Sequence, residues 1–114
     1  MKNAQPKYTD AQRQAFDFLT DHRCRLALQI LEDKNACTQA IADEIVRRGN
    51  GVLRMPVATM YNNMLRLEAL QLVVVNQIDS TRPGRARRIY TITQFGRACL
   101  TTYLTATADS LPSS

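Results

Sequence analysis

The chain has 114 residues, of which 45% are hydrophobic, a length and composition that suit one small domain with a modest core. Its formal net charge is +5, and the excess is one-sided: residues 1–44 carry 6 basic and 7 acidic groups, whereas residues 45–114 carry 9 and 3. A basic second half favours a polyanionic partner, because each Lys or Arg that meets a phosphate releases condensed counterions.

Three widely spaced cysteines, Cys24, Cys37 and Cys99, fit neither a disulfide framework nor the spacing of metal ligands. We therefore expect reduced, buried thiols. A redox sensor remains the alternative, and Cys24 between Arg23 and Arg25 comes closest to the electropositive setting that it would need. Because the sequence shows no signal peptide and no apolar run as long as a membrane span, we expect a cytoplasmic protein.

The amino-terminal part of the chain predicts a flexible arm followed by helices. Residues 1–8 are polar and predict the arm. Apolar residues recur at helical spacing over residues 9–33, with a break near residues 20–21 that favours two helices. We expect the piece around residues 16–19 to pack outside the core, and residues 23–31 to form the first core helix.

The middle of the chain predicts two further helices. Residues 34–37 are expected to be a connector, and Thr38 is expected to cap a helix that ends at residues 49–51. Pro56 suits the first turn of a third helix, which should run to about Leu70. One side of this third helix is apolar, and the opposite side has few charges for a solvated surface.

A hairpin and a last helix follow. Residues 72–78 and 88–93 are rich in β-branched side chains and flank a polar segment with a Pro-Gly pair, which is typical of a hairpin with a long loop. Thr93 is expected to cap a last helix, which completes a single domain of residues 9–105. Residues 106–114 are expected to be a flexible tail.

Three helices followed by a hairpin predict a mostly α fold with a two-stranded β-hairpin wing, the winged helix-turn-helix. In this fold the third helix lies in the major groove of DNA, and its amino-terminal half faces the base edges. Asparagine can bind adenine through two hydrogen bonds, and threonine can contact a base, a thymine methyl group or a phosphate. The candidate groove-facing residues are Thr59, Asn62, Asn63 and Arg66. A merely solvated Asn62, and an Asn63 that only closes a local hydrogen bond, are the alternatives.

Four arginines lie within the seven residues of the predicted wing, and no acid lies between them: Arg82, Arg85, Arg87 and Arg88. A hairpin tip of this kind can contact the minor groove or the phosphate backbone of duplex DNA. A solvated loop is the alternative, and Arg88 could instead pair with an acid of the fold such as Glu68. Weaker candidates for phosphate contacts are Arg47, Arg48 and Arg54.

Short motifs from the third helix to the last helix are similar to those of a known family. They are Thr59-Met60-Tyr61, Arg66-Leu67-Glu68, Gln71-Leu72-Val73, Arg88 to Thr93, and Gly96-Arg97. Over about residues 22–104 the chain resembles the PadR-like winged-helix transcriptional regulators, whose pattern is roughly T-L-Y-x-x-L-x-R-L-E-x-x-G-L and then R-x-Y-x-L-T-x-x-G. The chain departs from this pattern at Gln71, where the family usually has glycine, and in having a single helix after the wing.

The resemblance implies base-edge contacts from Thr59, Asn62 and Asn63 and wing contacts from Arg85 and Arg87. The single helix after the wing implies a compact dimer, similar to the short members of the family and in size to the period-extender type of cyanobacterial circadian clocks. The residues expected in the dimer interface are Phe16, Leu19, Leu100, Tyr103 and Leu104.

We therefore expect a homodimeric, sequence-specific regulator that binds double-stranded DNA and represses a promoter by occupying it. One histidine, dispersed cysteines and the lack of a glycine-rich phosphate loop argue against an enzyme, and no cofactor or metal is expected. A winged helix that binds another protein instead of DNA is the alternative, and RNA is disfavoured because the sequence shows no cluster of aromatics for stacking. A small hydrophobic effector near Phe16, Phe18 and Tyr103 stays open.

Overall fold

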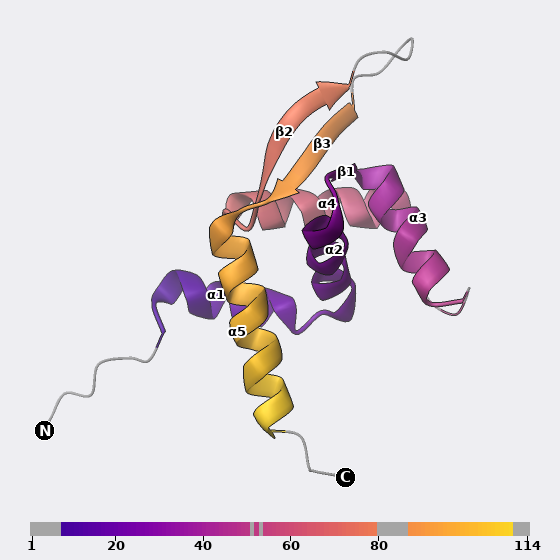
Figure 1. Cartoon of the computed structure of the whole chain (residues 1–114). Coiled ribbons are helices and arrows are strands. Elements are labelled where there is room, and N and C mark those ends of the chain that lie inside the picture. Colours follow the sequence, from indigo (N-terminus) through magenta and orange to yellow (C-terminus); the bar gives the residue numbers. More distant parts are fainter. Residues whose placement is uncertain (1–7, 51, 53, 80–86, 111–114) are drawn as a thin grey trace, which may run out of the picture.

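A computed structural model describes residues 8–50, 52, 54–79 and 87–110 of the chain. These residues form five helices and a small antiparallel sheet, so the expected mostly helical fold with a β-hairpin is confirmed (Figure 1). In chain order the elements are α1 (Asp10–Leu19), α2 (His22–Asp33), β1 (Ala36–Cys37), α3 (Thr38–Arg48), α4 (Val57–Ala69), β2 (Val73–Asp79), β3 (Arg87–Ile92) and α5 (Gln94–Ser110).

Two separately capped helices confirm the predicted break in the first helical stretch. The Thr9 hydroxyl accepts a hydrogen bond from the Gln12 N–H at 3.1 Å, and the Asp21 carboxylate accepts one from the Arg23 N–H at 2.9 Å. The expectation that the first piece packs outside the core is wrong, because Leu19 is 0% exposed within the core. α1 contacts both α2 and α5, so its apolar side completes the core.

The connector expected over residues 34–37 contains a strand, β1, that the sequence did not predict. Ala36 lies opposite Tyr90 and Cys37 lies opposite Ile89 in an antiparallel pairing with β3. Two residues are too few to show the alternation of a strand, and their partners lie far along the chain. The pairing therefore exists only because the tertiary fold brings β3 alongside β1.

The helices α3 and α4 begin and end close to the predicted residues. The N-cap of α3 is Cys37 rather than the expected Thr38, and no side chain caps this end of the helix. Gly49 is the C-cap, as predicted, and Asn50 follows it with a left-handed φ of 52°. Pro56 is the N-cap of α4 and has extended backbone, so it lies one residue before the first turn in which it was expected.

The sheet has the strand order β1-β3-β2, and the hairpin forms its larger part. In the register of the hairpin, Val73 lies opposite Ile92 and Asp79 lies opposite Arg87. A register shift between Val75 and Gln77 marks a bulge in β2. The strands match the predicted segments to within one residue at each end.

The helix α5 starts as predicted and ends later. The Gly96 N–H donates to the Thr93 hydroxyl at 2.8 Å, which confirms the expected cap. The helix continues to Ser110, so the tail expected from residue 106 is wrong for residues 106–110. No glycine or proline interrupts residues 97–110, and alanine favours the helix there. Figure 1 shows the carboxy-terminal half of α5 extending away from the other helices.

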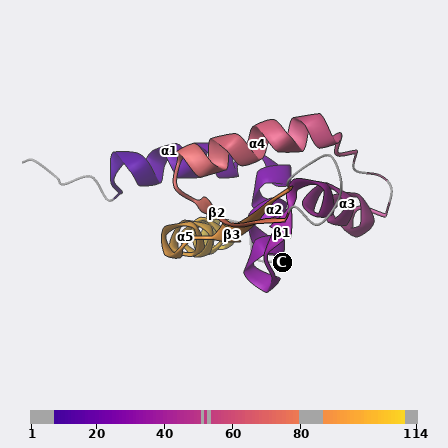
Figure 2. The same ribbon diagram turned by 90° about the horizontal axis from the view of Figure 1, so that it is seen from above.

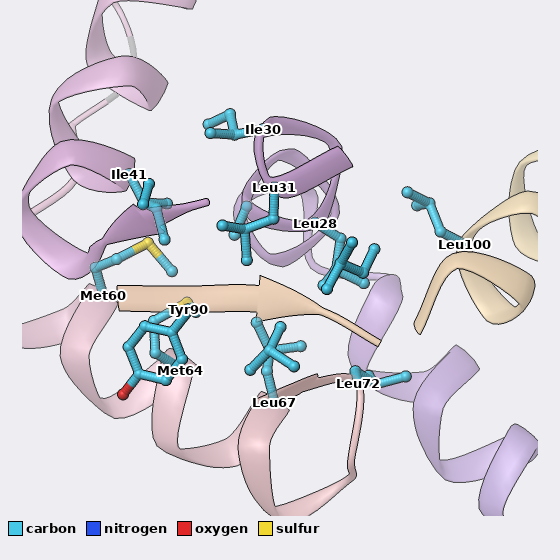
Figure 3. Close-up of a cluster of buried hydrophobic side chains, with 14 of the residues drawn as sticks. Leu28, Ile30, Leu31, Ile41, Met60, Met64, Leu67, Leu72, Tyr90 and Leu100 are labelled. Atoms are coloured by element: carbon cyan, nitrogen blue, oxygen red, sulfur yellow. The ribbon is translucent and has the colours of Figure 1, made fainter. Parts of the chain in front are cut away.

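The core lies between the sheet and the helices, with buried residues from all five helices, and Figure 3 shows part of it. Tyr90 is its largest fully buried side chain, and the tyrosine ring lies between α2 and α4 with its hydroxyl on the α4 side. The other large buried residues include Leu28, Leu31, Ile41, Ile45, Met60, Met64, Leu67, Leu72 and Leu100. This core holds α4 along one edge of the molecule (Figure 2), where its other side is free to meet a partner.

Candidate nucleic-acid interface

The buried residues of α4 determine which of its sides faces outward. Met60, Met64 and Leu67 recur at helical spacing, and each is 0% exposed. The exposed residues on the other sides of the helix are Val57, Ala58, Thr59, Tyr61, Asn62, Leu65, Arg66 and Ala69. We call these eight residues the outer face of α4. Its one charged member is Arg66, which confirms the low charge predicted for this side of the helix.

The candidate base-reading residues lie in the first half of α4. Thr59 and Asn62 are exposed on its outer face, whereas Asn63 is half-buried at the border of the core. Their side chains make no hydrogen bond within the described part of the chain. The amide of Asn62 is therefore available to both a donor and an acceptor on a partner, as the edge of adenine requires.

Arg66 points towards α1, away from the first half of the outer face. Its guanidinium lies 6.0 Å from the centroid of the Phe18 ring, a distance typical of a cation–π contact. Together with Gln14, Asp17, Ala69 and Leu70, these two residues line an open groove of about 370 Å³. The expected contact of Arg66 with DNA thus requires its side chain to leave Phe18 or to reach a phosphate beside α1.

The wing arginines divide into two pairs. Arg82 and Arg85 lie outside the described residues, while Arg87 and Arg88 begin β3. Consecutive residues of a strand point to opposite faces, and Arg88 shares its face with the buried Tyr90. The Arg88 Nη1 lies 3.4 Å from the Glu68 Oε1 in α4, which is the alternative pairing that the sequence left open.

The secondary phosphate candidates differ in their surroundings. Arg47 and Arg48 both pair with the Glu44 carboxylate, and these two guanidinium groups lower the pKa of Glu44 to about 2. Arg48 also lies 3.4 Å from an oxygen of Asp33. Arg54 is exposed and makes no ion pair within the described ranges. Because an arginine already paired with acids gains less from a phosphate, Arg54 is the strongest of the three candidates.

Sequence reasoning missed an apolar component of the outer face of α4. Val57, Tyr61 and Leu65 follow one another at a spacing of four residues, and they are 41%, 47% and 37% exposed. Side chains four residues apart are neighbours on a helix, and a contiguous apolar patch on a protein surface can mark a contact with a partner. The signal was present in the sequence, but an apolar residue next to the buried stripe of a helix is easily assigned to the core.

The cysteines are free thiols, and the surroundings of Cys24 argue against a redox sensor. Cys24 and Cys99 are buried, and Cys37 is half-buried. Burial first, and then the Asp21 carboxylate, raise the pKa of Cys24 to about 12, although Arg23 and Arg25 oppose the shift. The helix turns Cys24 into the core, so desolvation outweighs the neighbouring arginines and the reactive thiolate is disfavoured.

Two of the residues expected in a dimer interface belong to the core of the single chain. Leu19 and Leu100 are 0% and 1% exposed, so the structure removes them from the accessible surface, which corrects the expectation for them. Phe16 and Tyr103 are half-buried, with ring centroids 6.5 Å apart, and Leu104 is 37% exposed. Phe16 and Tyr103 line a groove of about 250 Å³ between α1 and α5, and Leu104 is not among its lining residues.

Within the described ranges, no group of three or more His, Cys, Asp or Glu residues could hold a metal ion. Among the described residues, none of the helices is both long and apolar enough to cross a lipid bilayer.

The helices α2, α3 and α4, followed by the β2–β3 hairpin, define a winged helix-turn-helix domain. The sequence model of the family described as transcriptional regulator PadR-like matches residues 27–102. The chain therefore belongs to the PadR-like family, a class of DNA-binding transcriptional regulators that are not enzymes. A search of curated protein sequences finds no significant match. The comparisons give no support to the narrower cyanobacterial period-extender type.

Solved structures of bacterial regulators share the fold. A transcriptional regulator from Clostridium thermocellum is 17% identical, with a TM-score of 0.69 over 82% of this chain and 87% of the regulator. A PadR family regulator from Clostridium difficile is 26% identical, with a TM-score of 0.61 over 75% of this chain and 85% of its own. Diamide-treated YodB from B. subtilis is 20% identical, with a TM-score of 0.68 over 95% and 99% of the two chains.

Proposed function

We propose that the chain is a homodimeric, sequence-specific regulator that represses transcription by occupying a promoter. The observation that carries the proposal is the outer face of α4, where exposed Thr59 and Asn62 have no partner within the described part of the chain. A helix with this face suits the major groove, because amide and hydroxyl groups can read base edges and small side chains permit close approach.

The wing supplies the sequence-independent part of the proposed binding. Arg87 and Arg88 begin β3 at the base of the wing, and Arg82 and Arg85 complete the basic segment in the sequence. Arg82, Arg85 and Arg87 would contact phosphates or the minor groove beside the half-site read by α4, and Arg88 would do so only on leaving its ion pair with Glu68. Contacts of this kind position the protein on the duplex, while the outer face of α4 selects the sequence.

A second copy would pack against α5 and α1 in the proposed dimer. Leu104 is exposed on α5, and the half-buried Phe16 and Tyr103 line a groove between α1 and α5. Two α4 helices related by a two-fold axis would read half-sites about one helical turn apart, roughly 34 Å, so the operator should be an imperfect palindrome.

The exposed apolar side chains of α4 favour one alternative function. Val57, Tyr61 and Leu65 could seat a protein partner on the same face, in which case the helix would not enter DNA. The high proportion of arginine in the wing argues for DNA, since a protein partner creates no general need for four cations there.

Binding to random duplex DNA and to a pool of genomic fragments, measured across a salt series, tests the proposal. The mass of the protein in solution is recorded under the same conditions. Recovery of a palindromic fragment, bound by a dimer far more tightly than random duplex, is the expected result. Absence of duplex binding even at low salt would contradict the proposal and make the protein-interaction alternative the leading one.

A further inference from the structure

The ion pair between Glu68 and Arg88 joins the last turn of α4 to the base of the wing. The Arg88 Nη1 lies 3.4 Å from the Glu68 Oε1, and the two side chains are 48% and 35% exposed. The contact is loose and open to solvent, and it engages one of the five N–H donors of the guanidinium. Arg88 therefore retains donors that a phosphate could use.

The pair borders the surface that α4 presents to DNA in the proposed function. Glu68 follows Tyr61 by seven residues, close to two turns of the helix, so both lie on the same side of α4. Tyr61 is 47% exposed and belongs to the outer face of α4. Arg88 shares the face of β3 that is turned towards α4, whereas Arg87 points to the other face.

A third polar group lies within the same contact between helix and wing. The Tyr90 hydroxyl is buried and makes no hydrogen bond of standard geometry among the described residues, but the Arg88 guanidinium lies close enough to interact with it as a donor. Burial raises the pKa of this hydroxyl, the nearby Arg88 guanidinium opposes the shift, and the Glu68 carboxylate adds to it. The charges of Glu68 and Arg88 thus act on one another and on Tyr90 at the junction where the wing leaves the core.

Glu68 is the only acid of α4, all of whose residues are described. A carboxylate at the border of a DNA-binding surface repels phosphates, and here it also neutralises an arginine that could otherwise attract them. A phosphate contact by Arg88 requires the guanidinium to leave or share the carboxylate, which then faces the DNA uncompensated. The pair therefore reduces the contribution of Arg88 to binding that does not depend on sequence.

We propose that Glu68 restrains Arg88, so that this wing arginine is withheld from DNA phosphates and the sequence-independent affinity of the protein is kept low. The inference rests on the proposed function, since it concerns the same surface. It assigns a role to an acid beside a basic interface, where an acid would otherwise only weaken binding.

The test compares four proteins on the same random duplex across a salt series: the wild type, Glu68→Gln, Arg88→Ala and the double variant. Glutamine keeps the shape of the side chain and removes its charge. For Glu68→Gln we expect tighter binding and a salt dependence that is steeper by up to about 0.9, the value for one additional phosphate contact. The ratio of the binding constant of Glu68→Gln to that of the wild type should therefore grow by about eightfold as the salt concentration falls from 1 M to 0.1 M. Arg88→Ala alone should weaken binding, because it leaves the Glu68 carboxylate unpaired beside the DNA. In the double variant the steeper salt dependence of Glu68→Gln should be absent, because no Arg88 guanidinium remains to contact the phosphate.

A charge-matched control separates this effect from a general increase in positive charge. Glu32→Gln removes an exposed acid of α2 that makes no ion pair among the described residues, and it changes the net charge by the same amount. Thermal unfolding of each variant records whether the fold is intact. Equal salt slopes for the wild type and Glu68→Gln, or a gain matched by Glu32→Gln or retained without Arg88, would overturn this inference alone. Failure of every variant to bind duplex DNA would overturn the proposed function together with it.

Discussion

Gly96 in α5 lies so close to the backbone carbonyl of Leu72 that no side chain fits between them. A Cβ atom at residue 96 would overlap this carbonyl oxygen and would lie 2.9 Å from Ile92 Cγ1. Thr93 donates two hydrogen bonds to the same carbonyl oxygen of Leu72, one from its hydroxyl at 3.1 Å and one from its backbone N–H at 3.0 Å. The start of α5 is thereby joined to the start of β2.

Gly96→Ala should destabilise the fold by about 1–3 kcal/mol or more, because backbone atoms must shift to admit the methyl group. Chemical denaturation with urea measures the change. Ala98→Ser, at an exposed position of the same helix, serves as the control and should have a small effect. Equal stability of Gly96→Ala and the wild type would show that the junction can relax.

Gln71 occupies a left-handed conformation with a φ of 64° at the end of α4. The Gln71 N–H donates to the Glu68 carbonyl and the Leu72 N–H donates to the Leu67 carbonyl, both at 2.9 Å, which is the hydrogen-bond pattern of a Schellman motif. The family pattern has glycine here because glycine adopts this conformation without steric cost. Glutamine in place of the family's glycine at residue 71 therefore keeps the geometry of the turn but adds backbone strain.

Gln71→Gly should raise the free energy of unfolding by up to about 1 kcal/mol, since relief of the left-handed strain exceeds the added flexibility of the unfolded chain. Thermal or urea unfolding provides the measurement. Ala69→Gly, two residues earlier and inside α4, should instead cost about 1 kcal/mol. If both variants lost the same stability, the positive φ at residue 71 would carry no measurable strain.

Arg85→Ala combined with Arg87→Ala should weaken binding to every duplex and reduce the salt dependence by up to about 0.9 for each lost phosphate contact. The prediction follows from the role of the wing in sequence-independent contacts. Salt titrations with operator and random DNA provide the measurement. An unchanged slope on both DNAs would exclude these two arginines from the phosphate contacts.

Asn62→Ala should mainly relax sequence choice, because the exposed amide is expected to bind a base edge rather than a phosphate. Loss of one good bidentate contact corresponds to about 1–3 kcal/mol of discrimination against the wrong base. Binding to the operator and to single-base variants of it reveals the position concerned. Equal losses on operator and random DNA would contradict the assignment of Asn62 to base recognition.

The stability of the protein should fall at alkaline pH because of Cys24. Burial raises the pKa of the Cys24 thiol to about 12 in the native state, whereas the pKa of the thiol in the unfolded chain is near its ordinary value of 9.0. The stabilisation from this group is fully present below about pH 9 and is lost as the pH rises towards 12. At pH 10 the loss should be roughly 1 kcal/mol.

Urea unfolding of the reduced protein at pH 7.5 and pH 10 measures this loss. Cys24→Ala provides the reference, since alanine has no proton to release. The change in the free energy of unfolding between pH 7.5 and pH 10 is compared for the two proteins, because a cavity at residue 24 lowers the stability of the variant equally at both pH values. If the wild type and Cys24→Ala lost equal stability, ionisation of other groups would account for the whole effect.

Local features of the sequence were sufficient to predict most of the elements and the outer face of α4. The spacing of Met60, Met64 and Leu67 identified the side of the helix that is buried, and therefore the side that carries Asn62. Thr93 was recognised as a cap because its hydroxyl acts on a neighbouring turn of the same helix. Each of these signals depends on residues a few positions apart in the chain, which is why the sequence alone contains them.

Contacts between distant segments were decided only by the tertiary structure. The strand β1 exists because β3 lies beside it, and α1 belongs to the core because α5 and α2 bury Leu19. The sequence offered Glu68 as one alternative partner of Arg88, and the packing of the hairpin against α4 selected it. The order of helices and strands, the basic wing and the inward side of α4 thus follow from short-range patterns. The pairing of charges, the third strand and the burial of α1 depend on long-range packing, whose energy is determined by all the elements at once.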